Sequence, residues 1–301
     1  MNWRRLILPG AILLIAALGA AYSIAWKTLR DVPAPFVEWD IPSDPLEKKM
    51  YDFAHSIKLP DSVPKAKPFA FCKKEILNFC LDKATPEEYW QHLCATEAGE
   101  YIFGSPTSGD GFHMVRPRKT EDTDHPTKVE DPLQEIIGGL SLGGRKDAYA
   151  ELFLNPLDRH YEYVDSYYKK SGYGGQPSWQ LGHFTWPRDK GNNTRMSDKD
   201  KPSSIGIVSE EIEVSSARYG VLTRGLRRQR DREFRIAGSE LIVFDRLNHE
   251  VLGVKRIFGL SHVVSRKTYG IFWQTAMTCP AIHENSLSKF VFRTVKVPGS
   301  N

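Results

Sequence analysis

One short motif in the chain has the residue types and spacing of a catalytic site. Residues 139–143 form a G-x-S-x-G pattern with Ser141 at its centre, the spacing that exposes a nucleophilic serine on a tight turn in many hydrolases. The chain order also allows a Ser…Asp…His triad, with Asp245 after the serine and His262 or His283 as the base. A serine esterase that uses Ser141, Asp245 and His262 is therefore one interpretation.

The residues on either side of the motif argue against that interpretation. A nucleophile elbow joins a buried strand to a helix, whereas the segment before the motif places Leu133, Ile136 and Ile137 at helical spacing. Two glycines follow Leu142, where the helix of the elbow would begin, and each costs about 1 kcal/mol in a helix. We therefore expect a flexible loop around Ser141, and no catalytic residue in it.

An apolar segment near the start of the chain predicts a membrane anchor. Residues 6–26 carry no charged side chain, and as a helix they would be roughly 31 Å long, close to the thickness of a bilayer core. Arg4 and Arg5 precede this segment, which favours retention of the N-terminus inside the cell. A cleaved signal peptide is the alternative, because small residues near position 20 offer a cleavage site. Both interpretations place the rest of the chain outside the cytoplasm.

Four cysteines follow the apolar segment, namely Cys72, Cys80, Cys94 and Cys279. An even number of cysteines in an oxidising compartment predicts two disulfides, for which three pairings are possible. Cys279 is far from the others, so one bridge is expected to tie the C-terminal region to the helical N-terminal region. The alternative is that the thiols are free and buried. The chain has no C-x-x-C pair, which disfavours a zinc or thioredoxin-like site.

Helix signals dominate the first part of the chain beyond the anchor. Prolines in residues 31–42 predict an extended linker. Asp44 and Thr85 are each a capping residue followed by proline, the pattern of a helix start. An apolar stripe after Cys72 predicts a further helix between these two. We expect a small helical layer in residues 43–98.

Strand signals dominate the remainder. Short segments of alternating apolar and polar residues follow one another closely, which favours antiparallel pairing. A turn is expected at residues 247–250, where Asn248 tolerates a left-handed backbone. The prediction is an α+β fold, with a transmembrane helix in residues 1–30 and a periplasmic domain in 43–301. In that domain the helical layer precedes a mainly antiparallel β-sheet in residues 100–301.

A cluster of arginines is a candidate interaction patch. On a basic hairpin these side chains could bind anionic lipid, a phosphate or an acidic partner, and the alternative is a solvated strand edge that charge protects from aggregation. The net charge of +4 does not indicate a nucleic-acid-binding protein. The arginines of this patch are Arg224, Arg227, Arg228, Arg230 and Arg232.

Aromatic residues gather in a second segment. They suit a protein interface or a carbohydrate platform, and the alternative is that they fill a core beneath long loops. The nine histidines of the chain show no metal-binding spacing, so we expect no metal and no cofactor. The aromatic residues concerned are Tyr161, Tyr163, Tyr167, Tyr168, Tyr173, Trp179, Phe184 and Trp186.

Several phrases of the sequence resemble those of one family. AGEYIF followed by GFHMVRPR, then DREFRIAGSELIVFDRLNHEVLG and CPAIHENSLSKFVFRTVKV, are similar to segments of an uncharacterised family of proteobacterial single-pass envelope proteins. The resemblance extends over much of residues 90–300 and its motifs are structural. It implies a bacterial cell-envelope location and transfers no activity and no functional residue.

We therefore expect a single-pass protein of the bacterial inner membrane with a periplasmic C-terminal domain. The expected role is binding or protection, with the membrane and another protein as partners, and without an enzyme activity, a nucleic acid or a small-molecule cofactor. One concrete form is an immunity protein that blocks a toxin aimed at the envelope. The alternatives are a serine esterase that uses Ser141 and a structural scaffold of an envelope complex.

Overall fold

The chain divides into two units, Met1–Val37 and Glu38–Asn301. The computed structural model describes residues 39, 41–76, 79–104, 107–116, 153–154, 161–170, 178–186, 207–262, 264–265, 270–271, 276–281 and 286–297. The predicted anchor, the segment around Ser141 and residue Tyr173 lie outside these ranges. None of the helices within them has the length and apolar character that a membrane span needs.

Two helices begin where the sequence predicts them. In α2 (Pro45–Ser56), the carboxylate of Asp44 accepts hydrogen bonds from the first free backbone N–H groups. In α3 (Pro86–Thr96), Thr85 and Glu88 form a capping box, in which each side chain binds the backbone N–H of the other residue. Both helix predictions are confirmed, and local capping chemistry is sufficient to explain where each helix starts.

The helix predicted after Cys72 is wrong. Residues there form an antiparallel hairpin of β1 (Cys72–Ile76) and β2 (Phe79–Lys83), which a disulfide between Cys72 and Cys80 closes, with a Cα–Cα distance of 5.6 Å. In a helix, two residues eight positions apart would be about 12 Å from one another, too far for a disulfide. The bridge therefore requires the hairpin, and the short apolar stripe fits either structure.

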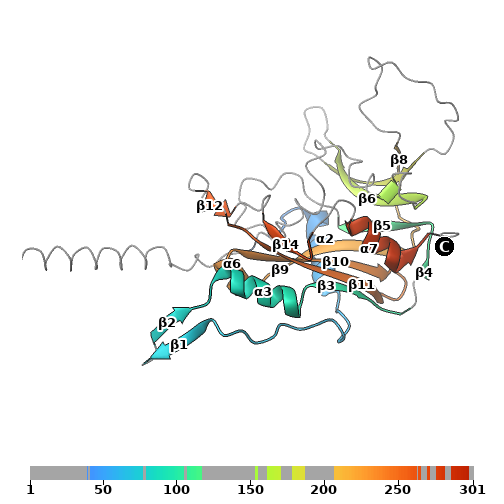
Figure 1. The fold of residues 1–301 in the computed structure, drawn as a ribbon. Coiled ribbons are helices and arrows are strands. Elements are labelled where there is room, and N and C mark those ends of the chain that lie inside the picture. The colour runs from blue at the N-terminus through green and yellow to red at the C-terminus, as the bar shows by residue number, and fades with distance from the viewer. Residues whose placement is uncertain are drawn as a thin grey trace, which may run out of the picture. The chain divides into compact units, whose positions relative to one another are not determined.

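A nine-stranded mixed sheet forms the centre of the second unit (Figure 1). Its strand order is β14-β11-β10-β9-β5-β6-β7-β8, and β3 pairs with the same side of β11 as β14 does. The bounds of these strands are β3 (Gly99–Ile102), β5 (Gly111–Arg116), β6 (Tyr163–Lys170), β7 (Ser178–Thr185), β8 (Val208–Glu211), β9 (Tyr219–Leu226), β10 (Ile236–Asp245), β11 (Val251–Leu260) and β14 (Met277–Cys279).

The pairing within this sheet is mainly antiparallel, which confirms the predicted class. Strand β5 is the exception, because it runs parallel to both of its neighbours, β6 and β9. Nothing in the sequence predicts this placement, since β5 inserts between two strands that come later in the chain. Smaller pairs lie outside the sheet, namely β4 (Thr107–Ser108) with β15 (Val295–Lys296) and β12 (Val264–Ser265) with β13 (Gly270–Ile271).

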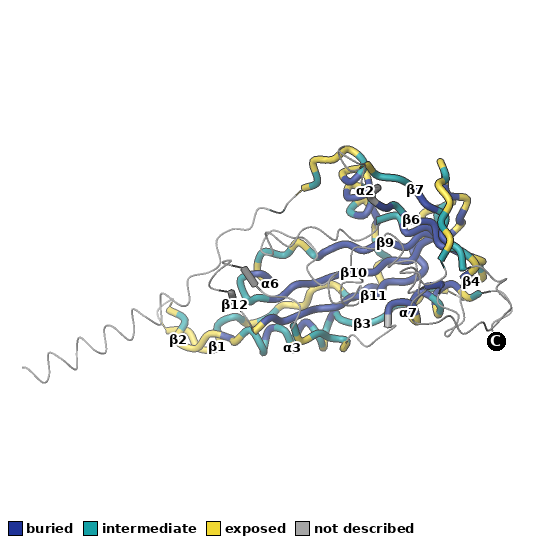
Figure 2. The backbone as a smooth tube through the Cα atoms, turned by 90° about the horizontal axis from the view of Figure 1, so that it is seen from above, coloured by how far each residue is buried: buried dark blue, intermediate teal, exposed yellow. Residues whose placement is uncertain are grey.

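Helices cover both faces of the sheet. Successive residues of a strand point to opposite faces. On β10, Ile242 belongs to the same apolar cluster as Ala54 of α2, whereas Val243 belongs to the cluster that contains Phe290 of α7 (Ser286–Thr294). All ten residues of β10 are buried as a result, and Figure 2 shows the central strands in dark blue. Helix α3 lies on the α2 face, where Tyr89 packs with Phe258.

A second disulfide joins distant parts of the chain. Cys94 of α3 is bonded to Cys279 of β14, 185 residues away in the sequence. The two disulfides confirm the prediction from cysteine number, and this bridge joins the C-terminal region to the helical part as expected.

The turn between β10 and β11 is also confirmed, with one difference. The residue with a left-handed backbone is His249, with φ 59°, whereas the sequence predicted Asn248. The Asn248 side chain instead accepts a hydrogen bond from the backbone N–H of Glu250.

Candidate functional site

The structure separates Asp245 and His262, two residues of the alternative triad. Ser141 and His283, the alternative base, lie outside the described residues. The carboxylate of Asp245 accepts hydrogen bonds from the Arg218 side chain and from the backbone of Leu247. His262 follows the opposite end of the β10–β11 hairpin, where its ring nitrogen is 3.5 Å from a Glu87 oxygen. The strands between Asp245 and His262 separate the two residues by roughly 30 Å, which excludes them as triad partners.

The arginines of the candidate patch do not form one exposed surface. Arg224 and Arg232 are buried, and Arg228 forms an ion pair with the buried carboxylate of Glu97. Arg227 donates a hydrogen bond to the Tyr51 hydroxyl. Arg227 and Arg230 are both exposed, and Arg230 pairs with Glu233. The sequence of this segment shows its positive charge. The carboxylate that neutralises Arg228 belongs to Glu97, which is 131 residues away in the chain.

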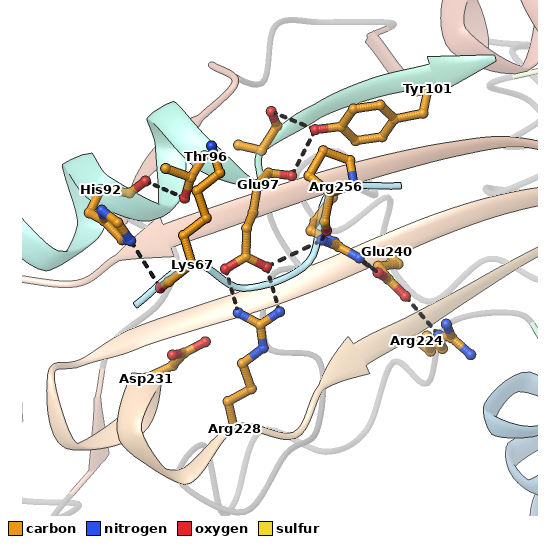
Figure 3. A network of polar contacts seen from close by, with 12 residues as sticks. Lys67, His92, Thr96, Glu97, Tyr101, Arg224, Arg228, Asp231, Glu240 and Arg256 are labelled. Carbon is orange, nitrogen blue, oxygen red and sulfur yellow. Dashed lines mark hydrogen bonds and ion pairs between the residues drawn. The ribbon is translucent and has the colours of Figure 1, made fainter. Parts of the chain in front are cut away.

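Four buried charged side chains and the partly buried Arg228 form a chain of ion pairs across the α2 face of the sheet (Figure 3). The Glu97 carboxylate accepts hydrogen bonds from both terminal nitrogens of Arg228, at 2.9 and 2.6 Å, and from one terminal nitrogen of Arg256, at 3.2 Å. Arg256 also donates to Glu240 at 2.7 Å, and Glu240 accepts the Nε of Arg224 at 2.8 Å. We call these five residues the buried ion-pair network.

The buried ion-pair network holds other segments of the chain to the sheet. Arg224 donates to the backbone carbonyls of Ala54 and Ile57, and Arg256 donates to the carbonyl of Pro64. These carbonyls belong to the end of α2 and to the segment that follows it. Arg224 and Arg256 therefore bind the chain itself.

Asp231 lies beside this network and titrates unusually. Its carboxylate is 1% exposed, one oxygen accepts the Tyr89 hydroxyl at 2.7 Å, and the other has no hydrogen-bond partner among the described residues. Burial raises the pKa of Asp231 to about 6, although the Tyr89 hydrogen bond and the Arg228 charge lower it in part. The native state therefore binds this proton more tightly than the unfolded chain does.

This shift predicts a pH dependence of stability. The folded pKa lies above the unfolded value, so the native state binds more protons between about pH 4 and pH 6, and stability falls as pH rises through that range. We expect Asp231→Asn to be more stable than the parent at pH 7 by on the order of 2 kcal/mol, and equal to it at pH 4.

Urea denaturation of both proteins from pH 4 to pH 7 measures this difference. The comparison removes the opposite contribution of His113, whose pKa burial lowers to about 3. A constant difference between Asp231→Asn and the parent over the range would contradict the prediction.

A row of titratable side chains crosses strands β5, β6 and β7. In register, His113 lies opposite Asp165, and Asp165 lies opposite His183. The Asp165 carboxylate is buried, and one of its oxygens is 2.6 Å from the Nδ1 of His183. Sequence reasoning missed this row, because its members are single residues on strands far apart in the chain.

The row contains the residue types of a Ser-His-Asp hydrolase triad, but in a different order. The Ser215 hydroxyl donates to the second oxygen of Asp165 at 2.5 Å. In a hydrolase triad the histidine lies between the serine and the carboxylate and takes the serine proton. Here Asp165 lies between Ser215 and His183, so the histidine does not activate this serine. Among the described residues, no group of three or more His, Cys, Asp or Glu side chains is arranged to hold a metal ion.

A pocket of about 330 Å³ lies between α2 and the sheet beside this row. One side of the lining comes from α2, and the other comes from β5, β6, the end of β10 and the turn after it. Gly220 of β9 makes room for the Phe244 ring, because a Cβ at that position would be 2.4 Å from the ring. The lining residues are Leu46, Lys49, Met50, Phe53, His113, Val115, Tyr167, Phe244, Arg246 and His249.

Three residues of the aromatic segment contribute to the core. Tyr161, Tyr168 and Phe184 are buried in the main apolar cluster, which supports the core alternative for these three. Tyr167 lines the pocket, and the Trp179 ring nitrogen donates to Glu47 of α2.

The β1–β2 hairpin exposes large apolar side chains. Phe79 is 74% exposed, Leu81 is 60% exposed and Ile76 is 49% exposed. Figure 2 shows β1 and β2 largely in yellow at one end of the second unit. The Cys72–Cys80 disulfide fixes the shape of this hairpin, so the apolar side chains stand on a rigid support.

Comparison of the chain with family models, with curated proteins and with solved structures gives no match. The resemblance to a family of envelope proteins remains a prediction.

Proposed function

We propose that this chain is an envelope-anchored binding protein whose partner is another protein, bound through the β1–β2 hairpin. The observation that carries the proposal is the exposure of Phe79, Leu81 and Ile76 on a hairpin that a disulfide closes. Neighbouring apolar side chains on a protruding element are typical of a protein interaction site. Because the hairpin is already rigid, binding costs little conformational entropy.

The charges on the hairpin favour a protein over a lipid surface. Lys73, Lys74 and Lys83 are exposed beside the exposed carboxylates of Glu75 and Asp82. An anionic membrane surface attracts clusters of basic residues, and the two carboxylates oppose such attraction. A mixture of both signs around an apolar centre suits the polar rim of a protein interface.

The proposed location rests on two features. The uncharged segment of residues 6–26 supports an anchor in the inner membrane, and the two disulfides support an oxidising compartment such as the periplasm. An immunity protein that blocks a toxin delivered to the periplasm is one concrete form of this function. A serine esterase is not proposed, because Asp245 and His262 lie at opposite ends of a hairpin, and Ser141 and His283 lie outside the described residues.

Photo-crosslinking in intact cells tests the hairpin. A benzophenone amino acid in place of Phe79 should give one discrete protein adduct, whereas the same probe in place of Leu247 should not. Leu247 is the matched control, because it is 81% exposed on a turn of the sheet away from the hairpin. Equal adducts at both positions, or adducts with lipid alone, would contradict the proposal.

The double substitution Phe79→Ser/Leu81→Ser should reduce co-purification of the crosslinked protein by about tenfold or more, because buried aromatic anchors dominate binding free energy. Leu247→Ser should leave it unchanged. For the immunity form, cells with the double variant should become as sensitive as deletion cells to neighbours that secrete the toxin. Unchanged co-purification would overturn the role of the hairpin.

A further inference from the structure

The pocket between α2 and the sheet has two kinds of wall. Leu46, Met50, Phe53, Val115 and Phe244 make an apolar wall, as most small-molecule sites have. The volume of the pocket, about 330 Å³, lies at the lower end of the range for ligand pockets. A ligand of this site must therefore be small and must carry a substantial apolar part.

The polar part of the lining carries nitrogen atoms and no carboxylate. It consists of Lys49, His113, Arg246 and His249, together with the hydroxyl-bearing Tyr167. The nearby carboxylate of Asp165 is already shared between His183 and Ser215. Lysine and arginine remain cationic at neutral pH, so the pocket attracts a negative charge.

Two of these groups have capacity for a ligand. Arg246 donates to Ser215 and Ala217 through Nη1 alone, so within the described residues its Nε and Nη2 remain available. Lys49 forms no ion pair with any other described residue. A guanidinium edge with two free N–H groups matches a carboxylate or a phosphate.

His113 gives an independent indication of a ligand. Its side chain is 6% exposed, yet neither ring nitrogen has a hydrogen-bond partner in the described part of the chain. Leaving a buried polar group unsatisfied costs about 1–3 kcal/mol. Burial and the Arg246 charge lower the pKa of His113 to about 3, so the ring is neutral and offers one donor and one acceptor.

We propose that this pocket binds a small amphipathic anion, with its apolar chain between α2 and the sheet and its carboxylate or phosphate at Arg246 and Lys49. The neutral ring of His113 donates a hydrogen bond to the anion or to a water bound to it. This site is separate from the β1–β2 hairpin, so it stands whether or not the hairpin binds a protein.

Isothermal titration of the full-length protein with soluble probes tests the chemistry. Octanoate should bind at least tenfold more tightly than octyltrimethylammonium, which has the same chain and the opposite charge. From hexanoate to decanoate, affinity should rise about threefold to fourfold per methylene until the pocket is full. Octyl phosphate against octanoate distinguishes a phosphate-bearing from a carboxylate-bearing source. Binding of the cation as tight as that of octanoate would overturn the proposal.

Variants of α2 separate the pocket from unspecific uptake of these probes. Leu46→Trp fills the pocket from a partly exposed helix position and should abolish the titration. Lys49→Gln should weaken octanoate binding about threefold. The matched control is Lys48→Gln, because Lys48 pairs with Asp52 outside the pocket, and this variant should bind octanoate as the parent does. Full octanoate binding by a folded Leu46→Trp protein would also overturn the proposal.

Discussion

Removal of the Cys94–Cys279 disulfide should lower the free energy of unfolding by about 5 kcal/mol in the loop-entropy description. The bridge closes a loop of 185 residues, and cross-links of long loops restrict the unfolded chain most. Domains are stable by only about 5–15 kcal/mol. The double variant Cys94→Ser/Cys279→Ser should therefore be largely unfolded near 37 °C, which circular dichroism and guanidinium denaturation measure.

The hairpin disulfide provides the control for this prediction. Cys72 and Cys80 are eight residues apart, so the double variant Cys72→Ser/Cys80→Ser should lose only about 2–3 kcal/mol. The order of the two losses is the informative result. If the short bridge proved the more stabilising of the two, loop entropy would not be the main contribution of Cys94–Cys279.

The second large effect is expected at Glu97. Its buried carboxylate neutralises Arg228 and Arg256, and Glu97→Gln keeps the shape of the side chain while removing the charge. Removal of one partner from a buried ion pair typically costs about 3–5 kcal/mol, because it leaves uncompensated charge in the interior. Thermal denaturation at neutral pH should show a melting temperature roughly 10 °C lower, given about 2–4 °C per kcal/mol for a domain of this size.

An exposed ion pair is the appropriate comparison. Asp61 and Lys65 form one in which both side chains are largely in solvent, so Asp61→Asn should leave the melting temperature unchanged. Equal losses in Glu97→Gln and Asp61→Asn would show that burial of the ion-pair network contributes nothing. A loss confined to Glu97→Gln supports the structural role.

The sequence predicts those elements whose signals are local. The starts of α2 and α3 are encoded by capping residues within four positions of each other. The strands of the β10–β11 hairpin are encoded by the local alternation of apolar and polar residues, and the turn is encoded by its own residues. The segment 72–83 could not be assigned this way, because its apolar residues fit a helix and a hairpin equally well. The choice depends on the Cys72–Cys80 bond, and the sequence alone left three pairings open.

The candidate site was harder to predict than the fold. Arg228 and its partner Glu97 are 131 residues apart, so a sequence window around the arginines shows only excess positive charge. Asp165 meets His183 across the β6–β7 pair, and His113 joins them only because β5 inserts between β6 and β9. That insertion depends on long-range pairing, and no periodicity within 111–116 encodes it.

The insertion of β5 divides the sheet into two wings, β6 to β8 on one side and β9 to β14 on the other. In the described part of the chain, the main-chain pairing between the wings runs through this six-residue strand alone. The pocket lies across this seam, because His113 belongs to β5, Tyr167 to one wing and Phe244 to the other. Any molecule held there contacts both wings at once, so it would act as a brace that resists shear between the two halves of the sheet.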